Sequence, residues 1–104
     1  MGEVDSEEVP VAPIQDAMLD DATVGQLFFD VENASEGVEV FVKGGAVERA
    51  TDRPFALSEA RALFMSSVVH AVQLRYRYRG SEWWDTLIRQ PQGVRLVRIE
   101  QKFR

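Results

Sequence analysis

The clearest indication of the fold is residues 72–100, which read VQLRYRYRGSEWWDTLIRQPQGVRLVRIE. Polar and apolar side chains alternate along three segments, 72–79, 82–89 and 94–100, which is the pattern of half-buried β-strands. Gly80-Ser81 fits a type II′ hairpin turn, and residues 90–93 (QPQG) fit a type I turn with a glycine bulge. The stretch therefore predicts a three-stranded antiparallel meander.

These two turns set a register, and the register decides which face of the sheet each side chain occupies. Across the first turn, the expected pairs are Arg79 with Glu82, Arg77 with Trp84, Arg75 with Thr86, Tyr78 with Trp83 and Leu74 with Leu87. Across the second turn, they are Ile88 with Leu96, Leu87 with Val97, Thr86 with Arg98 and Trp84 with Glu100. One face then carries the predicted core: Leu74, Tyr76, Tyr78, Trp83, Leu87, Val97 and Ile99. The other carries Arg75, Arg77, Arg79, Glu82, Trp84, Thr86 and Arg98, with Ile88 and Leu96 at its end.

The segments before the meander predict two helices and one more strand. Residues 22–34 place Val24, Leu27, Phe28 and Val31 at helical spacing, and Thr23 with Gln26 fits a capping box, although Gly25 and the Phe28-Phe29 pair also suit a strand. We expect a helix there. A second helix is expected from an N-cap at Ser58 to about residues 67–70, with an inward stripe of Ala60, Leu63, Phe64 and Ser67.

Alternation of Val38, Val40 and Val42 predicts a half-buried strand at residues 38–43. Gly44-Gly45 suits a hairpin turn, residues 46–50 a short returning strand, and residues 51–55 a loop. Residues 13–21 have a short apolar pattern that suits a loose helical turn, and the acidic residues 1–12 are expected to form a disordered arm.

Together these elements predict one α+β domain, residues 13–104. Its two layers are a mainly antiparallel sheet, ending in the meander, and two helices on one face. In this arrangement Tyr76, Tyr78 and Trp83 pack against helix side chains: Leu27, Phe28, Leu63 and Phe64. Segment 94–100 becomes an edge strand whose charges protect it only partly from pairing with other chains.

Composition removes several classes of function. The 104 residues include no Cys and a single His, His70, so the sequence predicts no disulfide, no thiolate metal site, no thiol nucleophile, no bound metal and no cofactor. There is no apolar run of 18 residues and the first nine residues are acidic, so we expect no membrane span, no secretory signal and a cytoplasmic location.

The charge is divided unevenly along the chain. Residues 1–42 contain eleven acidic residues and no Lys or Arg, whereas residues 43–104 contain all twelve basic residues and six acidic ones. Such asymmetry favours either packing of the acidic part on the basic part or a charged face that meets a partner.

The strongest candidate site is the arginine-rich sheet face. Arg75, Arg77, Arg79 and Arg98 would surround Trp84, and Arg and Trp are enriched in protein interfaces. We therefore expect a non-enzymatic interaction module that binds an acidic partner protein, or its own copy, through bidentate arginines around an indole. The competing structural interpretations are a solvated sheet face with cross-strand pairs, or a face covered by the acidic first third of the chain.

Two other functions stay open. The same face suits an anion or a nucleic acid, with the acidic arm as a mask, although a net charge of −5 opposes binding to phosphates. A small enzyme would need Asp85 and His70 to converge. Asp85 falls on the predicted core face beside Tyr76, where a hydrogen bond to a tyrosine hydroxyl or to a backbone amide at the sheet rim is the usual arrangement. His70 suits a cap or surface position near the end of the second helix.

Overall fold

The computed structural model describes residues 14–43 and 55–101. Along these residues the elements are β1 (Ile14–Leu19), α2 (Asp21–Ala34), β2 (Glu36–Lys43), α4 (Leu57–Met65), β3 (Ala71–Tyr78), β4 (Ser81–Gln90) and β5 (Gly93–Gln101). The expected arm (1–12), the Gly44-Gly45 turn, the strand at 46–50 and most of the loop at 51–55 lie outside these ranges.

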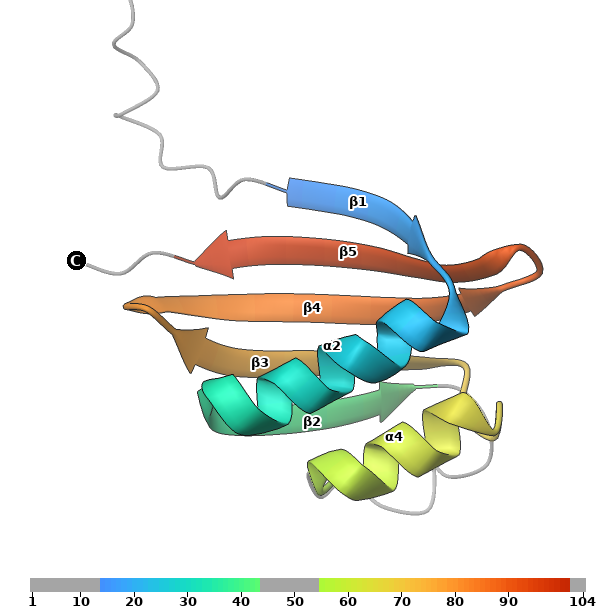
Figure 1. Cartoon of the computed structure of the whole chain (residues 1–104), viewed down its shortest axis with the longest axis horizontal. Coiled ribbons are helices and arrows are strands. Elements are labelled where there is room, and N and C mark those ends of the chain that lie inside the picture. The colour runs from blue at the N-terminus through green and yellow to red at the C-terminus, as the bar shows by residue number, and fades with distance from the viewer. Residues whose placement is uncertain (1–13, 44–54, 102–104) are drawn as a thin grey trace, which may run out of the picture.

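The fold is α+β, as predicted. The strands of the described residues form one antiparallel sheet in the order β1-β5-β4-β3-β2, and both helices lie against the same face of it (Figure 1). The meander of β3, β4 and β5 is confirmed. The expected helical turn at residues 13–21 is wrong, because residues 14–19 form β1 and pair with β5. For the same reason β5 is an interior strand, and the edges are β1 and β2.

The turn of the first hairpin lies one residue earlier than expected, which shifts the pairing between β3 and β4 by two residues. Tyr78 pairs with Ser81, and both turn residues, Arg79 and Gly80, have positive φ angles of 53° and 82°. That geometry belongs to a type I′ turn rather than the type II′ turn at Gly80-Ser81. Because the shift is an even number of residues, every side chain of β3 and β4 keeps its predicted face.

The second hairpin differs by one residue, and this reverses the faces of β5. Gln90 pairs with Gly93 across a two-residue turn, and the ladder continues from there without the expected bulge. Val94 and Leu96 are therefore buried in the core. Val97 and Ile99, which were expected in the core, lie on the opposite face. Arg98 moves in the other direction, onto the helix-covered face.

The helix at residues 22–34 is confirmed, and the strand alternative is excluded. Its N-cap is Asp20 rather than Thr23: the Thr23 backbone N–H donates to Asp20 Oδ1 at 2.8 Å. The second helix begins at Leu57 after Ala56, which makes no side-chain cap, so the expected Ser58 cap is wrong. It ends at Met65, before the expected residues 67–70.

The core lies between the helices and the sheet. Phe28 and Phe64 meet at its centre, with ring centroids 6.5 Å apart, and Leu27 and Leu63 pack at its edge. Tyr76 is buried as predicted, and Trp83 is partly buried. Tyr78, expected in the core, is 36% exposed because it is the last residue of β3.

Part of the charge asymmetry is resolved inside the chain. Asp16 of β1 binds Arg95 of β5 at 2.6 Å, and Asp21 of α2 binds Arg89 of β4 at 3.0 Å. Arg89 also donates to the Phe64 carbonyl oxygen near the end of α4, at 3.1 Å, and its guanidinium lies 4.8 Å from the Phe64 ring centroid. These contacts support the expectation that acidic and basic parts of the chain pack on each other.

Gly93→Ala is expected to lower the free energy of unfolding by about 2 kcal/mol. Gly93 has φ +148°, and a Cβ atom there would lie 2.8 Å from the Leu19 carbonyl oxygen of β1. Gly25→Ala is the control: its Cβ would meet only Arg61 Nη2, at 3.6 Å, and alanine favours the helix, so this variant should gain about 0.5–1 kcal/mol. Urea denaturation measures both. Equal stability of the two variants would contradict the assigned turn.

No helix within residues 14–43 and 55–101 is long and apolar enough to span a bilayer.

Candidate functional site

The predicted partner-binding residues divide between two sides of the sheet. Arg75, Arg77 and Trp84 lie on the face opposite the helices, which we call the open face. Arg79 lies in the β3–β4 turn at the end of this face rather than within it. Arg98 lies on the helix-covered face. The structure thus brings together three of the five predicted residues.

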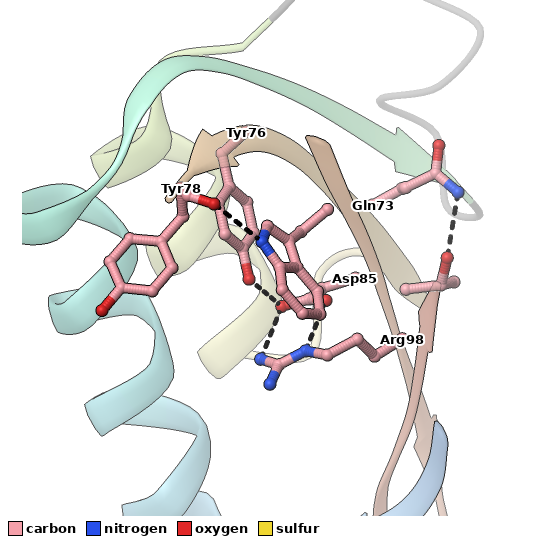
Figure 2. Close-up of polar contacts among 7 residues, drawn as sticks. Gln73, Tyr76, Tyr78, Asp85 and Arg98 are labelled. Atoms are coloured by element: carbon pink, nitrogen blue, oxygen red, sulfur yellow. Dashed lines mark hydrogen bonds and ion pairs between the residues drawn. The ribbon is translucent and has the colours of Figure 1, made fainter. Parts of the chain in front are cut away.

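A stacked guanidinium lies at the centre of the open face. The Cζ atom of Arg75 lies 4.1 Å from the Trp84 ring centroid and 4.6 Å from the Phe41 ring centroid. Its Nε donates to Gln73 Oε1 at 2.8 Å. Gln73 in turn donates to Thr86 Oγ1 at 3.0 Å, the bond drawn from Gln73 in Figure 2. Arg75 is the cross-strand partner of Trp84, so the predicted arginine–indole contact exists, but with Arg75 in place of Arg77.

The rest of the open face is apolar at its centre and charged at its rim. Ile88 of β4 and Val97 and Ile99 of β5 join Trp84 and Phe41, and all five are half-buried. The charged groups carry both signs: Glu39, Lys43, Arg77, Glu82, Asp16 and Arg95. Glu82 accepts a hydrogen bond from Trp84 Nε1 at 2.7 Å, which fixes the indole against the sheet.

A buried ionic cluster occupies the helix-covered face. Asp85 is fully buried, and its carboxylate accepts hydrogen bonds from the Tyr76 hydroxyl at 2.6 Å, Arg98 Nε at 2.8 Å and Arg98 Nη2 at 2.9 Å (Figure 2). The predicted bond between Asp85 and a tyrosine hydroxyl is thus present. Asp85 and Arg98 are cross-strand partners, which allows the two-pronged contact.

The cluster raises the pKa values of Tyr76 and Arg98. Burial, together with the adjacent Asp85 carboxylate, raises the pKa of Tyr76 above its ordinary value, so this hydroxyl stays protonated as the donor. Hydrogen bonds to Asp85 raise the pKa of Arg98, and burial opposes this only in part. A buried carboxylate is tolerated here because a guanidinium and a hydroxyl compensate it.

His70 and Asp85 do not come together. His70 is exposed between α4 and β3, and its backbone N–H donates to the Lys43 carbonyl oxygen at 3.0 Å. Asp85 pairs with Leu74, four residues further along β3, or roughly 13 Å at the usual strand rise. The convergence that the small-enzyme hypothesis needed is therefore absent from the structure.

Sequence reasoning missed the roles of Phe41 and Arg98. Phe41 alternates with the buried valines of β2, so its place opposite the core was visible, but its neighbour Arg75 depended on the sheet order. For Arg98 a usable signal existed. Asp85 was expected on the core face, and a buried carboxylate requires a cation on an adjacent strand, which favours the register that pairs it with Arg98.

No protein-family model, no curated protein and no solved structure matches this chain.

Proposed function

We propose that the chain is a non-enzymatic interaction module whose open face binds a second copy of the same chain. The observation that carries this proposal is the composition of that face: an apolar centre around the stacked Arg75 and Trp84, with charges of both signs at its rim. In the described residues no helix lies on this side of the sheet (Figure 1).

The reversed β5 strand changes which of its side chains lie on the open face. Val97, Ile99 and Arg95 lie there in place of Leu96 and Arg98, and Val97 and Ile99 share cross-strand rows with Thr86 and Trp84. Homodimer interfaces are more apolar than interfaces between proteins that associate transiently. Two adjacent branched side chains beside Trp84, with the arginine at the rim, favour a permanent partner of similar character.

Charge favours a second copy over an acidic partner or a nucleic acid. Arg75 and Arg77 lie beside Glu39 and Glu82, their cross-strand partners, and Arg95 is held by Asp16. A polyanion needs a net positive field, which these carboxylates cancel. In a two-fold pairing, the rim of one copy presents both signs to the rim of the other, so opposite charges can meet.

The area of the face suits such an interface. Five strands at about 4.8 Å spacing, each of roughly eight residues at about 3.3 Å rise, cover roughly 600 Å². A stable interface buries about 800 Å² of accessible surface on each partner. Side chains project from the sheet, so the accessible surface of the face is larger than its flat area. One sheet face is thus close to the size needed.

Sedimentation equilibrium of the full chain tests the proposal. We expect twice the 11.8 kDa chain mass at about 100 µM, and the monomer mass for Val97→Lys, with dimer affinity about 100-fold lower. Asp16 lies opposite Val97 in the sheet, so the new ammonium gains a carboxylate neighbour and the fold should be kept. Far-UV circular dichroism checks the fold.

Val68→Lys is the matched control. Val68 is a valine whose side chain is 49% accessible, and it lies outside the sheet, between α4 and β3. This variant should remain a dimer. A monomeric wild-type chain, or a Val97→Lys variant that dimerises like the wild type, would refute the proposal.

A further inference from the structure

A cleft on the helix-covered side of the sheet is independent of the open face. It measures about 370 Å³ and lies between α2 and one end of β3, β4 and β5. Its lining includes Leu27 and Val31 of α2, Tyr78 and Trp83 of the sheet, and Arg98. Small-molecule sites measure roughly 300–1,000 Å³, so the cleft has room for a single small organic molecule.

Arg98 supplies hydrogen-bond donors to this cleft. A guanidinium has five N–H groups, and Asp85 accepts from two of them. The side chain is 26% exposed and lines the cleft, so part of the guanidinium faces it. Because Asp85 holds Nε and Nη2 from behind, the remaining edge is fixed in orientation before any ligand arrives. Fixed guanidinium edges match the two oxygens of a carboxylate.

Two aromatic side chains form flat walls beside that guanidinium. The Trp83 ring centroid lies 5.7 Å from Arg98 Cζ, and Trp83 Nε1 donates to the Tyr78 carbonyl oxygen at 3.2 Å, which holds the indole in place. In Figure 2 the Tyr78 hydroxyl and the Arg98 guanidinium both point toward α2. On the helix side, Leu27 and Val31 are apolar. A flat, apolar body fits between these walls.

Three further charges surround the cleft. Asp85 neutralises Arg98 from behind, and Asp30 of α2, exposed and bound by Gln26 Nε2 at 2.8 Å, stands on the lining. At the other side, Arg79 lies 5.2 Å from the Tyr78 ring centroid. Two cations thus balance two anions. Asp85 is bound by Arg98, so Asp30 is the carboxylate on the cleft lining that would repel an anionic ligand.

We propose that this cleft binds a small planar organic acid, with its carboxylate on Arg98 and its ring between Trp83 and α2. Arg98 positions the acid, the aromatic walls select a flat body, and the volume excludes larger molecules. The Asp30 carboxylate repels the carboxylate of the acid and so lowers the affinity of the cleft for it.

Benzoate is the probe, and the two neighbouring tryptophans report where it binds. Trp83 lines the cleft and Trp84 lies on the open face, so a titration followed by the two indole N–H signals in NMR distinguishes the surfaces. We expect the Trp83 signal to shift and saturate with a Kd on the order of 1 mM, as fits a ligand of this size, while Trp84 stays in place. A Trp84→Phe variant assigns the signals. Benzamide, which is uncharged, should bind at least about 10-fold more weakly.

Two substitutions on α2 separate a local charge effect from a general one. Asp30→Asn should tighten benzoate binding about 3-fold, because it removes the repulsive carboxylate. Glu32→Gln removes the same charge from the same helix, but Glu32 faces the groove toward α4, so binding should not change.

Arg98→Lys tests the guanidinium itself. It keeps the positive charge and loses the planar edge, and should weaken binding about 10-fold.

Four results would overturn the proposal: no shift of Trp83 with benzoate, a larger shift of Trp84, equal binding of benzamide, or weaker binding in Asp30→Asn. The last would mean that Asp30 does not repel the carboxylate of the bound acid. If Arg98→Lys fails to fold, Asp30→Asn and Glu32→Gln still decide, since both residues are exposed on α2.

Discussion

Asp85→Ala is expected to destabilise the protein by about 3–5 kcal/mol, the cost of breaking an ion pair whose carboxylate is fully buried. The carboxylate compensates Arg98 through two hydrogen bonds and accepts a third from the Tyr76 hydroxyl. Its removal leaves the guanidinium on the helix-covered face, together with a buried hydroxyl donor that has no acceptor. Domains of this size are stable by about 5–15 kcal/mol, so the loss is a large share of the total. Urea denaturation at neutral pH measures it.

Asp16→Ala is the matched control. Asp16 also binds an arginine through two nitrogens, Arg95 Nε and Nη2, but this pair lies on the exposed surface. Solvent screens exposed pairs, so we expect a far smaller change in the free energy of unfolding. Comparable losses in the two variants would show that burial is not what makes the Asp85 cluster costly to break.

A paired replacement separates the cost of an orphaned charge from the value of the pair. Asp85→Leu combined with Arg98→Leu removes both charges together, and buried ion pairs replaced by apolar side chains are often neutral or stabilising. The double variant should therefore be more stable than Asp85→Ala. If it is as unstable, the effect arises from altered packing rather than from the uncompensated guanidinium.

Phe28→Ala is expected to cost about 3–5 kcal/mol, whereas Phe29→Ala should change the free energy of unfolding by less than about 0.5 kcal/mol. The two residues are adjacent in α2, but Phe28 is 1% exposed and Phe29 is 57% exposed. Phe28 packs against Phe64 between the helices and the sheet, so its loss leaves a cavity in the core. Phe29 loses little buried surface, and alanine favours the helix.

Urea denaturation of the two variants, with the wild type, measures this difference. Helix content by far-UV circular dichroism is the accompanying control, because both substitutions leave α2 with a good helix former. Equal losses of stability would contradict the orientation of α2 in the structure, in which Phe28 is buried and Phe29 is not.

Local sequence patterns identified most of the elements. The stripe of Val24, Phe28 and Val31 gave α2, and all three are buried. Alternation in residues 72–89 placed Arg75 and Trp84 on one face and Tyr76 and Asp85 on the other, although the predicted pairing of the two strands was shifted by two residues. The same sequence patterns were misleading where a partner strand decides the conformation. Ile14, Ala17 and Met18 have helical spacing, yet residues 14–19 form β1 because the backbone of β5 is available to pair with them.

The class of fold, the helices and the parity of β3 and β4 could be predicted, because these depend on side-chain periodicity within single segments. The faces of β5 could not, because they depend on contacts between strands. β5 pairs with β1 from the other end of the chain, Arg98 meets Asp85 on β4, and the turn after Gln90 has no bulge. A shift of one residue exchanges every side chain between faces, so these long-range contacts moved Arg98 away from the predicted docking surface and into a cleft.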